Sequence, residues 1–399
     1  MSEVQQNVYI YDTFNSSEPS KIDEVIFLSS EDLKESFPDP FDVVLQKKIQ
    51  SFPVGTKYRD IVLSYFQRLQ GHASTTAGYI PNIDRYGVVS DYISQLWLDS
   101  SKNPSIFKTS RDFEPILKRI PYYRDHFIHS FNVFTLGYYI INRTKAVLPS
   151  FDFKSNAFNL TWMLASTFHD VAYPMQKMEN WLNELFDKFL GVNPRFHYDI
   201  TQVIPMIYTD FLKMISRWHK QPLQGPLGTQ DLLDLDWTFY DETCAKLVEK
   251  DHGVLGGLML AHLLAVKEGF AGERTWDFLF NHLPACHSIC VHNLSSLCIG
   301  FRKHPLAFLL ILCDEMQEWG RPSKLENMDN IRLLDVDVSL EGERIVVTFD
   351  ALISHERQKL LRKELNRHID TDGRIGINII NRIEPENVVT IDDRGVMIH

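Results

Sequence analysis

Asp314 is a carboxylate in a stretch of sequence that is otherwise apolar. It follows FLLILC, six residues without a charge. Burying a carboxylate in such surroundings is costly unless it is paired, hydrogen-bonded or bound to a cation. A simpler interpretation is that a helix emerges into solvent here, because Glu315 and Glu318 follow. Asp314 alone therefore does not decide between a metal ligand and a helix end.

Further ionisable residues share this setting, each at an apolar segment. They are His129 in DHFIHSFNVF, His169 and Asp170 after LTWMLASTF, His252 in DHGVLGGLML, and His292 in SICVHNLSSL. Each alone has an ordinary explanation, such as a core histidine bonded to a carbonyl. Together they run His, His-Asp, His, His, Asp, with gaps of 40, 82, 40 and 22 residues. Imidazole and carboxylate together suit divalent manganese, iron, cobalt, nickel or zinc. An aspartate beside a histidine can also bridge two ions, which makes a dinuclear site possible.

The elements that must position these residues are predicted to be helices. Residues 61–325 are expected to form one helical catalytic domain, preceded by an irregular segment, 1–60, with strand-like fragments VYIYDTF and EVIFLSS. Apolar residues recur at helical spacing in KYRDIVLSYFQRL and in YRDHFIHSFNVFTLGYYIINR. The last helix of this domain is expected to start at Pro305 and stop at Gly320. A Gly/Pro/Asp-rich loop is expected between Lys220 and Asp241.

The pattern changes in residues 331–399, which predict a small α+β subdomain. Alternating apolar residues on both sides of a turn in LLDVDVSLEGERIVVTFDAL predict a hairpin. A charged helix, HERQKLLRKELNRHI, then the strand IGINII and a second hairpin, NVVTIDDRGVMIH, are expected to follow. The predicted fold class is mainly α, a helical bundle with this C-terminal α+β appendix.

Composition and charge indicate the compartment and exclude some partners. The chain has 399 residues and a net charge of −11, so no general nucleic-acid binding is expected. The five cysteines are odd in number, as expected of free thiols in a reducing compartment. The N-terminus lacks a signal pattern, and the strongest apolar run, PLAFLLILC, is far too short for a membrane span. We expect a cytoplasmic protein without a membrane partner; a homo-oligomer is left open.

The order of ligand residues resembles that of the HD superfamily of metal-dependent phosphohydrolases, H…HD…H…H…D on a helical bundle. FHDVAYP is similar to the HD signature of cyclic-nucleotide phosphodiesterases, HGVLGG resembles the H-x-x-x-G helix start of the dinuclear branch, and CVHN and LILCDEMQEW resemble the last two ligand positions. The resemblance covers about residues 120–320. The residues VAYP after the pair carry neither the lysine nor the histidine of other branches, so no subfamily is assigned.

The resemblance implies roles for these residues. One divalent ion would be held by His129, His169, Asp170 and Asp314. A second would be held by Asp170, His252 and His292, with Asp170 bridging. A water activated by the metal would then attack a phosphorus atom.

Other side chains near the motifs are weaker candidates. His126, one helical turn before His129, could protonate the leaving oxygen. Arg124, Lys177 and Arg321 are candidates for phosphate binding, although each is also explained as a solvated charge.

Several histidines compete with this set or fall outside it. His287 is a rival for His292; the two lie about 140° apart around a helix, so they should not serve one ion through one face. The remaining histidines of the helical region, His262, His282 and His304, are interpreted as structural, and His219 receives no role.

The expected function is metal-dependent hydrolysis of a phosphoester, a nucleotide or cyclic nucleotide, by a phosphodiesterase or nucleotidase. Two alternatives remain. One is an HD-type di-iron oxygenase. The other is a non-catalytic, metal-stabilised module that binds a nucleotide or assembles through residues 331–399.

Overall fold

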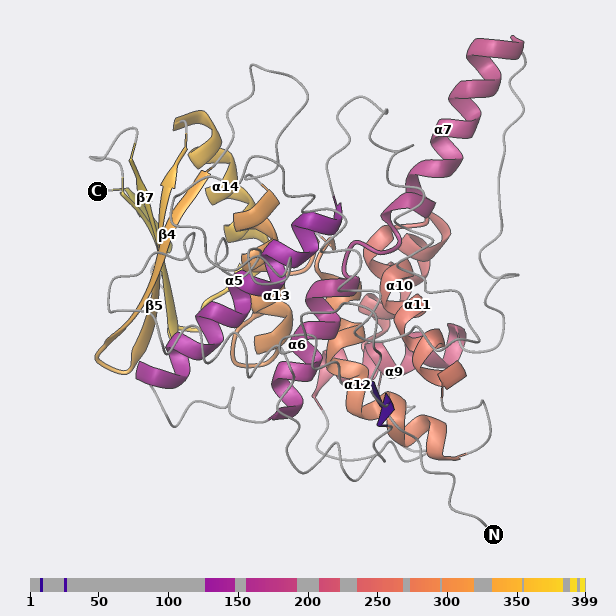
Figure 1. Ribbon diagram of the computed structural model, residues 1–399, viewed down its shortest axis with the longest axis horizontal. Helices are drawn as coiled ribbons and strands as arrows, with labels where there is room; N and C mark the ends of the chain where they lie inside the picture. The colour runs from indigo at the N-terminus through magenta and orange to yellow at the C-terminus, as the bar shows by residue number, and fades with distance from the viewer. Residues whose placement is uncertain are drawn as a thin grey trace. The chain divides into compact units, whose positions relative to one another are not determined.

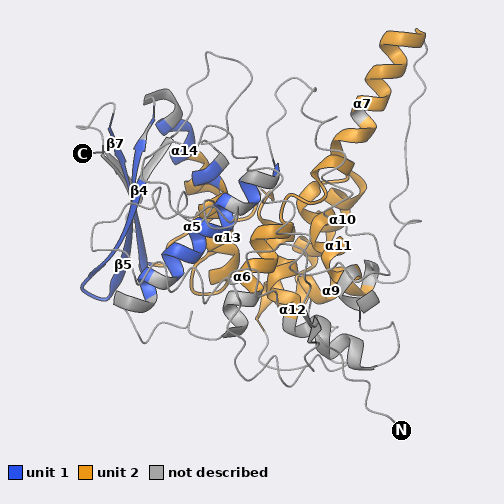
Figure 2. Cartoon of the chain, viewed as in Figure 1, with its two compact units in different colours: residues 1–160, 315–362, 373–399 blue, residues 161–314, 363–372 orange. Residues whose placement is uncertain are grey.

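The computed structural model describes residues 8–9, 25–26, 126–147, 156–191, 208–222, 235–267, 273–294, 296–318, 332–353, 355–382, 388–392 and 395–398 (Figure 1). The chain divides into two compact units (Figure 2). The first comprises residues 1–160, 315–362 and 373–399, and the second comprises residues 161–314 and 363–372. Each unit is described by itself.

The first unit is built on a five-stranded sheet. Its strands are β4 (Arg332–Glu341), β5 (Arg344–Leu352), β7 (Ile375–Asn381), β8 (Val388–Asp392) and β9 (Gly395–Ile398), paired in that order. Only β5 and β7 are parallel. Helix α14 (His355–His368) lies between them in the chain, as a parallel connection requires. Both predicted hairpins, β4–β5 and β8–β9, are present.

One face of this sheet is buried, in keeping with the alternating sequence. Val336 and Val338 on β4 oppose Phe349 and Val347 on β5, and all four are buried. Helix α5 (His126–Val147) contacts β4, and the hydroxyl of its Tyr139 donates to the Val336 carbonyl at 3.0 Å. The hydrogen bond satisfies the polar end of an otherwise buried ring.

The second unit is helical. It contains most of α6 (Asn156–Phe168) and α13 (Pro305–Glu318), together with α7 (Tyr173–Leu190), α9 (Tyr208–Lys220), α10 (Trp237–Val248), α11 (His252–Lys267) and α12 (Glu273–Val291). A short parallel pair, β3 (Ile299–Gly300) with β6 (Ile369–Asp370), belongs to it as well. The C-terminal half of α7 extends away from α10 and α11 (Figure 1). Gly191 ends α7 in a left-handed conformation, which glycine adopts without steric cost.

Helices α11 and α12 pack closely because glycines line their contact. A side chain at Gly257 would overlap the sulfur of Cys290 and come within 2.8 Å of the Cys286 carbonyl. A side chain at Gly253 would lie 2.9 Å from the Ile289 carbonyl. The close approach brings the first turn of α11, which carries His252, against the end of α12, which His292 follows directly.

The predicted fold class, mainly α with a small α+β part, is confirmed. The expected loop at 220–241 is too long at its C-terminal end, because α10 already begins at Trp237. The Asp236 side chain caps that helix by accepting from Phe239 N at 3.1 Å, so the acidic residue starts a helix rather than extending a loop.

Little of the predicted N-terminal segment is described. Strand β1 (Val8–Tyr9) pairs with β2 (Val25–Ile26), one in each predicted strand-like fragment. The rest of residues 1–60 and the helix expected over KYRDIVLSYFQRL lie outside the described residues, and the three domain boundaries stay predictions. Among the helices that are described, none combines the length and apolar character needed to cross a membrane.

Candidate metal centre

His169 and Asp170 lie in a tight turn between two helices. Helix α6 ends at Phe168 and α7 begins at Tyr173, where Pro174 occupies the first turn. Within the turn, Val171 N donates to the Phe168 carbonyl at 3.1 Å. His169 is fully buried and Asp170 is 6% exposed. The apolar run thus ends inside the protein. A helix emerging into solvent would instead end at the surface.

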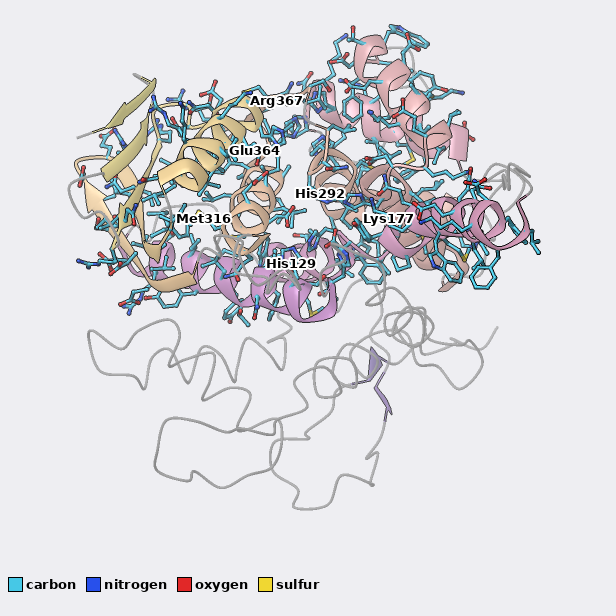
Figure 3. All side chains as sticks on the ribbon, turned by 90° about the horizontal axis from the view of Figure 1, so that it is seen from above. His129, Lys177, His292, Met316, Glu364 and Arg367 are labelled. Atoms are coloured by element: carbon cyan, nitrogen blue, oxygen red, sulfur yellow. The ribbon has the colours of Figure 1, made fainter. Side chains whose placement is uncertain are left out.

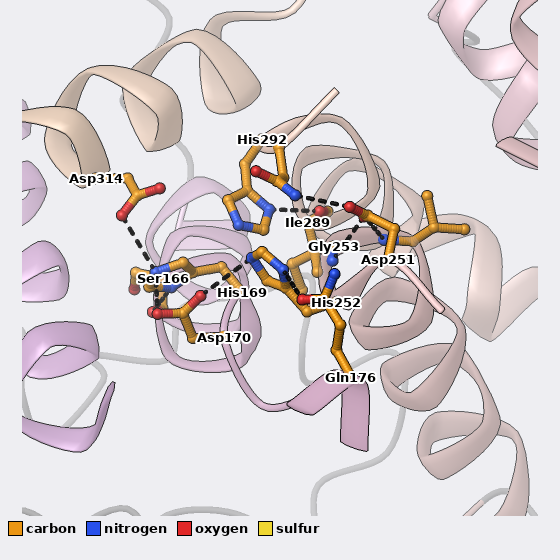
Figure 4. A network of polar contacts seen from close by, with 12 residues as sticks. Ser166, His169, Asp170, Gln176, Asp251, His252, Gly253, Ile289, His292 and Asp314 are labelled. Carbon is orange, nitrogen blue, oxygen red and sulfur yellow. Dashed lines mark hydrogen bonds and ion pairs between the residues drawn. The ribbon is translucent and has the colours of Figure 1, made fainter. Parts of the chain in front are cut away.

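Two of the histidines are held by backbone carbonyls. His169 Nδ1 lies 2.7 Å from the Ser166 carbonyl, and His292 Nδ1 lies 2.7 Å from the Ile289 carbonyl (Figure 4). Since a carbonyl can only accept, each Nδ1 carries a proton, and Nε2 is the nitrogen left to face a carboxylate or a cation. A carbonyl partner of this kind typically fixes the tautomer and orientation of a metal-binding histidine.

A side chain does the same for His252. Gln176, in the first turns of α7, places its Oε1 3.0 Å from His252 Nδ1 (Figure 4). The Tyr173 ring packs edge-on against the imidazole, with ring centroids 5.4 Å apart. His252 therefore also presents Nε2 as its free nitrogen.

The Nε2 atoms of His169 and His252 face the carboxylates. His252 Nε2 lies 3.4 Å from Asp170 Oδ1, and His169 Nε2 lies 3.6 Å from Asp170 Oδ2. His169 Nε2 is also 3.6 Å from Asp314 Oδ1 on α13. These separations exceed those of ordinary hydrogen bonds. The shortest is within the distance of about 3.0–3.5 Å between neighbouring ligand atoms around an ion with bonds of about 2.1 Å, and the other two are 0.1 Å or so above it.

The His292 ring completes the group. It lies edge-on to both other imidazoles, with centroids 5.2 Å from His169 and 5.1 Å from His252. One ligand atom each from Asp170, His252 and His292 lies within 4.8 Å of the others. This is a clustered His/Asp group that could hold a divalent cation.

The charge state of the two histidines that face Asp170 differs. For His169, burial opposes protonation, but the carboxylates of Asp170 and Asp314 outweigh it and raise the pKa to about 9. For His252, burial outweighs the attraction of Asp170 and, with help from His292, lowers the pKa to about 4. His252 is ready to bind a cation at neutral pH, whereas a cation must displace a proton from His169.

Asp251 ties the two helix ends of the centre together. Its Oδ1 accepts from Gly253 N at 3.0 Å and Val254 N at 3.1 Å, which caps α11. Its Oδ2 accepts from Asn293 Nδ2 at 2.7 Å, directly after His292. One buried carboxylate thus fixes the residues that neighbour both His252 and His292.

The structure separates the two rival histidines. His292 lies with Asp170 and His252, whereas His287 faces His219 and His304 elsewhere in the second unit. The predicted angle of about 140° assumed that both residues lie on one helix. However, α12 ends at Val291, and His292 lies in the following turn.

Other predicted residues are placed less fully. His126 and His129 lie on α5 in the first unit, and both are buried, at 7% and 1% exposed; their roles stay predictions. Lys177 lies on α7 (Figure 3). Its ammonium is 5.0 Å from the centre of the Tyr173 ring. Arg124 and Arg321 lie outside the described residues.

Gln176, Asp251 and Asn293 were not singled out from the sequence as parts of the centre. Asp251 directly precedes the helix that begins at His252, where an aspartate commonly serves as a cap. Gln176 is an ordinary polar residue of an amphipathic helix, and its role depends on an approach between α7 and α11 that sequence does not display.

Comparison of the chain with known protein families, with curated proteins and with solved structures found no match. The likeness to the HD superfamily therefore depends on the order of the ligand residues and on the geometry described above. The helical fold and the His/Asp cluster are compatible with an HD-type site.

Proposed function

We propose that this chain is a metal-dependent phosphohydrolase of the HD type, acting on a nucleotide or cyclic nucleotide. The observation that carries the proposal is the convergence of His169 and His252 on the two separate oxygens of Asp170. Both imidazoles are already oriented by partners on Nδ1. This arrangement is what a carboxylate shared by two cations requires.

In the proposal, His169, Asp170 and Asp314 hold one cation; His129 stays a ligand candidate that the resemblance alone implies. Asp170, His252 and His292 hold the other. Manganese, iron, cobalt, nickel and zinc are all compatible with these donors. When bound, such ions lower the pKa of a coordinated water and offset negative charge on a phosphoryl oxygen.

The chain supplies further groups around the centre. Lys177 and Tyr173 are adjacent on α7, and Tyr173 contacts His252, so Lys177 is our candidate for binding a phosphate oxygen. The Tyr173 ring is the candidate surface for stacking a base. His126 is proposed to protonate the leaving oxygen.

The test uses the purified full-length chain loaded in turn with manganese, iron, cobalt, nickel and zinc. Bis-p-nitrophenyl phosphate and a panel of linear and cyclic nucleotides serve as substrates. Hydrolysis is expected in at least one loaded form. Asp170→Asn should reduce it by more than about 100-fold, because losing a direct ligand should cost more than the 10- to 100-fold typical of an outer-shell partner. Asp187→Asn, the same change at an exposed position of α7, is the control and should retain activity.

Absence of turnover on the whole panel by protein with bound metal would contradict hydrolysis. Oxygen consumption by the iron form, with an iron charge-transfer band, would instead identify the oxidative alternative. Nucleotide binding without turnover of either kind would identify a binding module.

A further inference from the structure

A second group of imidazoles lies in the helical unit, apart from Asp170. It consists of His219 in the last turn of α9, His287 on α12 and His304 just before α13. One nitrogen from each lies within 4.8 Å of the others. His287 and His304 are 1% and 5% exposed, and His219 is half-buried. Three separate elements thus contribute to one small cluster.

The distance between two of these nitrogens is that of neighbouring metal ligands. His219 Nδ1 lies 3.1 Å from His287 Nε2. Two ligand atoms in a tetrahedral site with bonds of about 2.0 Å lie about 3.3 Å apart. In the metal-free protein, one of these nitrogens donates a hydrogen bond to the other. A cation would replace that single shared proton.

The third imidazole has its tautomer fixed. His304 Nε2 lies 3.0 Å from the carbonyl of His219, so Nε2 carries the proton and Nδ1 keeps a lone pair. Phe239 stacks on the His219 ring, with centroids 4.2 Å apart and planes 9° apart. Phe239 thereby holds His219, the histidine closest to solvent, in place. Neighbouring groups commonly orient metal ligands in this way.

Protons do not compete for these nitrogens near neutral pH. Burial, with the neighbouring Lys303, lowers the pKa of His219 to about 4. Burial and His219 lower the pKa of His304 to about 3, and burial likewise lowers that of His287. The Lys303 charge disfavours a cation here, whereas three neutral imidazoles offer it direct bonds.

We infer that His219, His287 and His304 form a second metal site, which binds a zinc-class cation through three imidazole nitrogens. All three donors are nitrogens, a set that favours zinc, copper, nickel or cobalt over magnesium, calcium or manganese. The ion would join the end of α9, the body of α12 and the start of α13. Its fourth position would remain for water or an added ligand. This site is independent of the proposed hydrolysis.

The experiment counts bound ions in the Asp170→Asn background, which removes the shared carboxylate of the other centre. Full-length protein is dialysed against zinc, and the bound metal is measured by mass spectrometry. Adding His219→Phe, which keeps an aromatic ring against Phe239, should lower the stoichiometry by one zinc per chain. His262→Phe, the same exchange on α11 outside both groups, should leave it unchanged.

Cobalt provides a second measurement, with a variant of a different ligand of the site. The Asp170→Asn protein loaded with cobalt should show the visible absorption of a tetrahedral site, and His304→Gln should remove it. Equal zinc stoichiometry with and without His219→Phe would overturn the inference, as would the absence of the tetrahedral cobalt band. Loss of hydrolysis by the wild-type chain would overturn only the proposed function.

Discussion

Gln176 Oε1 lies 3.0 Å from His252 Nδ1 and faces the nitrogen opposite the one directed at Asp170. A residue of α7 thereby sets the orientation of a candidate ligand on α11. Gln176 is not itself a candidate ligand, but the orientation of the candidate ligand His252 depends on it.

Gln176→Leu should therefore weaken metal binding while preserving the fold. Losing an outer-shell partner of a ligand histidine typically costs about 10- to 100-fold in affinity. The measurement is a titration of the metal-free protein with manganese or zinc. Gln176→Glu keeps an acceptor oxygen and should restore most of the affinity; equal affinity in the leucine variant and the wild type would contradict this role.

Asp251→Ala should lower both stability and metal affinity. Removing a helix cap costs about 1 kcal/mol, and the freed Asn293 amide adds the cost of a lost hydrogen bond to a charged group, so we expect about 2–3 kcal/mol. Urea denaturation measures the loss. Asp236→Ala removes the cap of α10 alone, so its cost should be about 1 kcal/mol without effect on metal binding.

Substitutions at two glycines of α11 distinguish the effect of helix packing from the effect on metal binding. A methyl group at Gly253 would lie 3.1 Å from the His292 ring and 2.9 Å from the Ile289 carbonyl that holds it. Gly253→Ala should displace His292 and reduce metal affinity. Gly257→Ala places its methyl group against Cys290 instead. It should lower the free energy of unfolding by about 1–3 kcal/mol and leave the metal affinity unchanged. If both variants bound metal normally, His292 would not be needed as a ligand.

The metal-free protein should be most stable near neutral pH. The pKa values of His252 and His304, about 4 and about 3, lie below the usual 6.5, so the unfolded chain binds more protons and stability falls as pH drops below 6.5. His169 acts in the opposite sense. Its raised pKa contributes stability that is complete below pH 6.5 and is lost as pH rises through about 9.

Denaturation of the chelated protein at pH 4.5, 7 and 9.5 measures these slopes. His304→Gln should reduce the loss of stability between pH 7 and 4.5 by on the order of 2 kcal/mol. A variant with the same slope as the wild type over that interval would show that His304 titrates normally.

The helices of the candidate centre could be predicted from the sequence because residues at their own ends determine where they start and stop. Gly191 ends α7 and Pro305 begins α13, and both act through their own backbone preferences. The order of the ligand histidines and aspartates could likewise be compared with a known pattern. The start of α10 was missed because its cap, Asp236, lies in a segment rich in loop residues.

Contacts between distant elements could not be predicted in this way. His219 and His287 are 68 residues apart, and neither lies in a pattern that distinguishes it from a core histidine. His304 was interpreted as structural and His219 received no role, although the three rings gather at one point. The packing of α9 against α12 brings His219 to His287, and His304 meets the His219 carbonyl.

Asp170 offers one oxygen to each of two histidines, and this division has a thermodynamic consequence. Two cations held on either side would share one carboxylate and repel each other across it. Binding of the first would then change the affinity for the second, and linkage requires the second to change the affinity for the first by the same factor. The two occupancies would rise as a coupled pair, so a titration should depart from the curve of two independent sites.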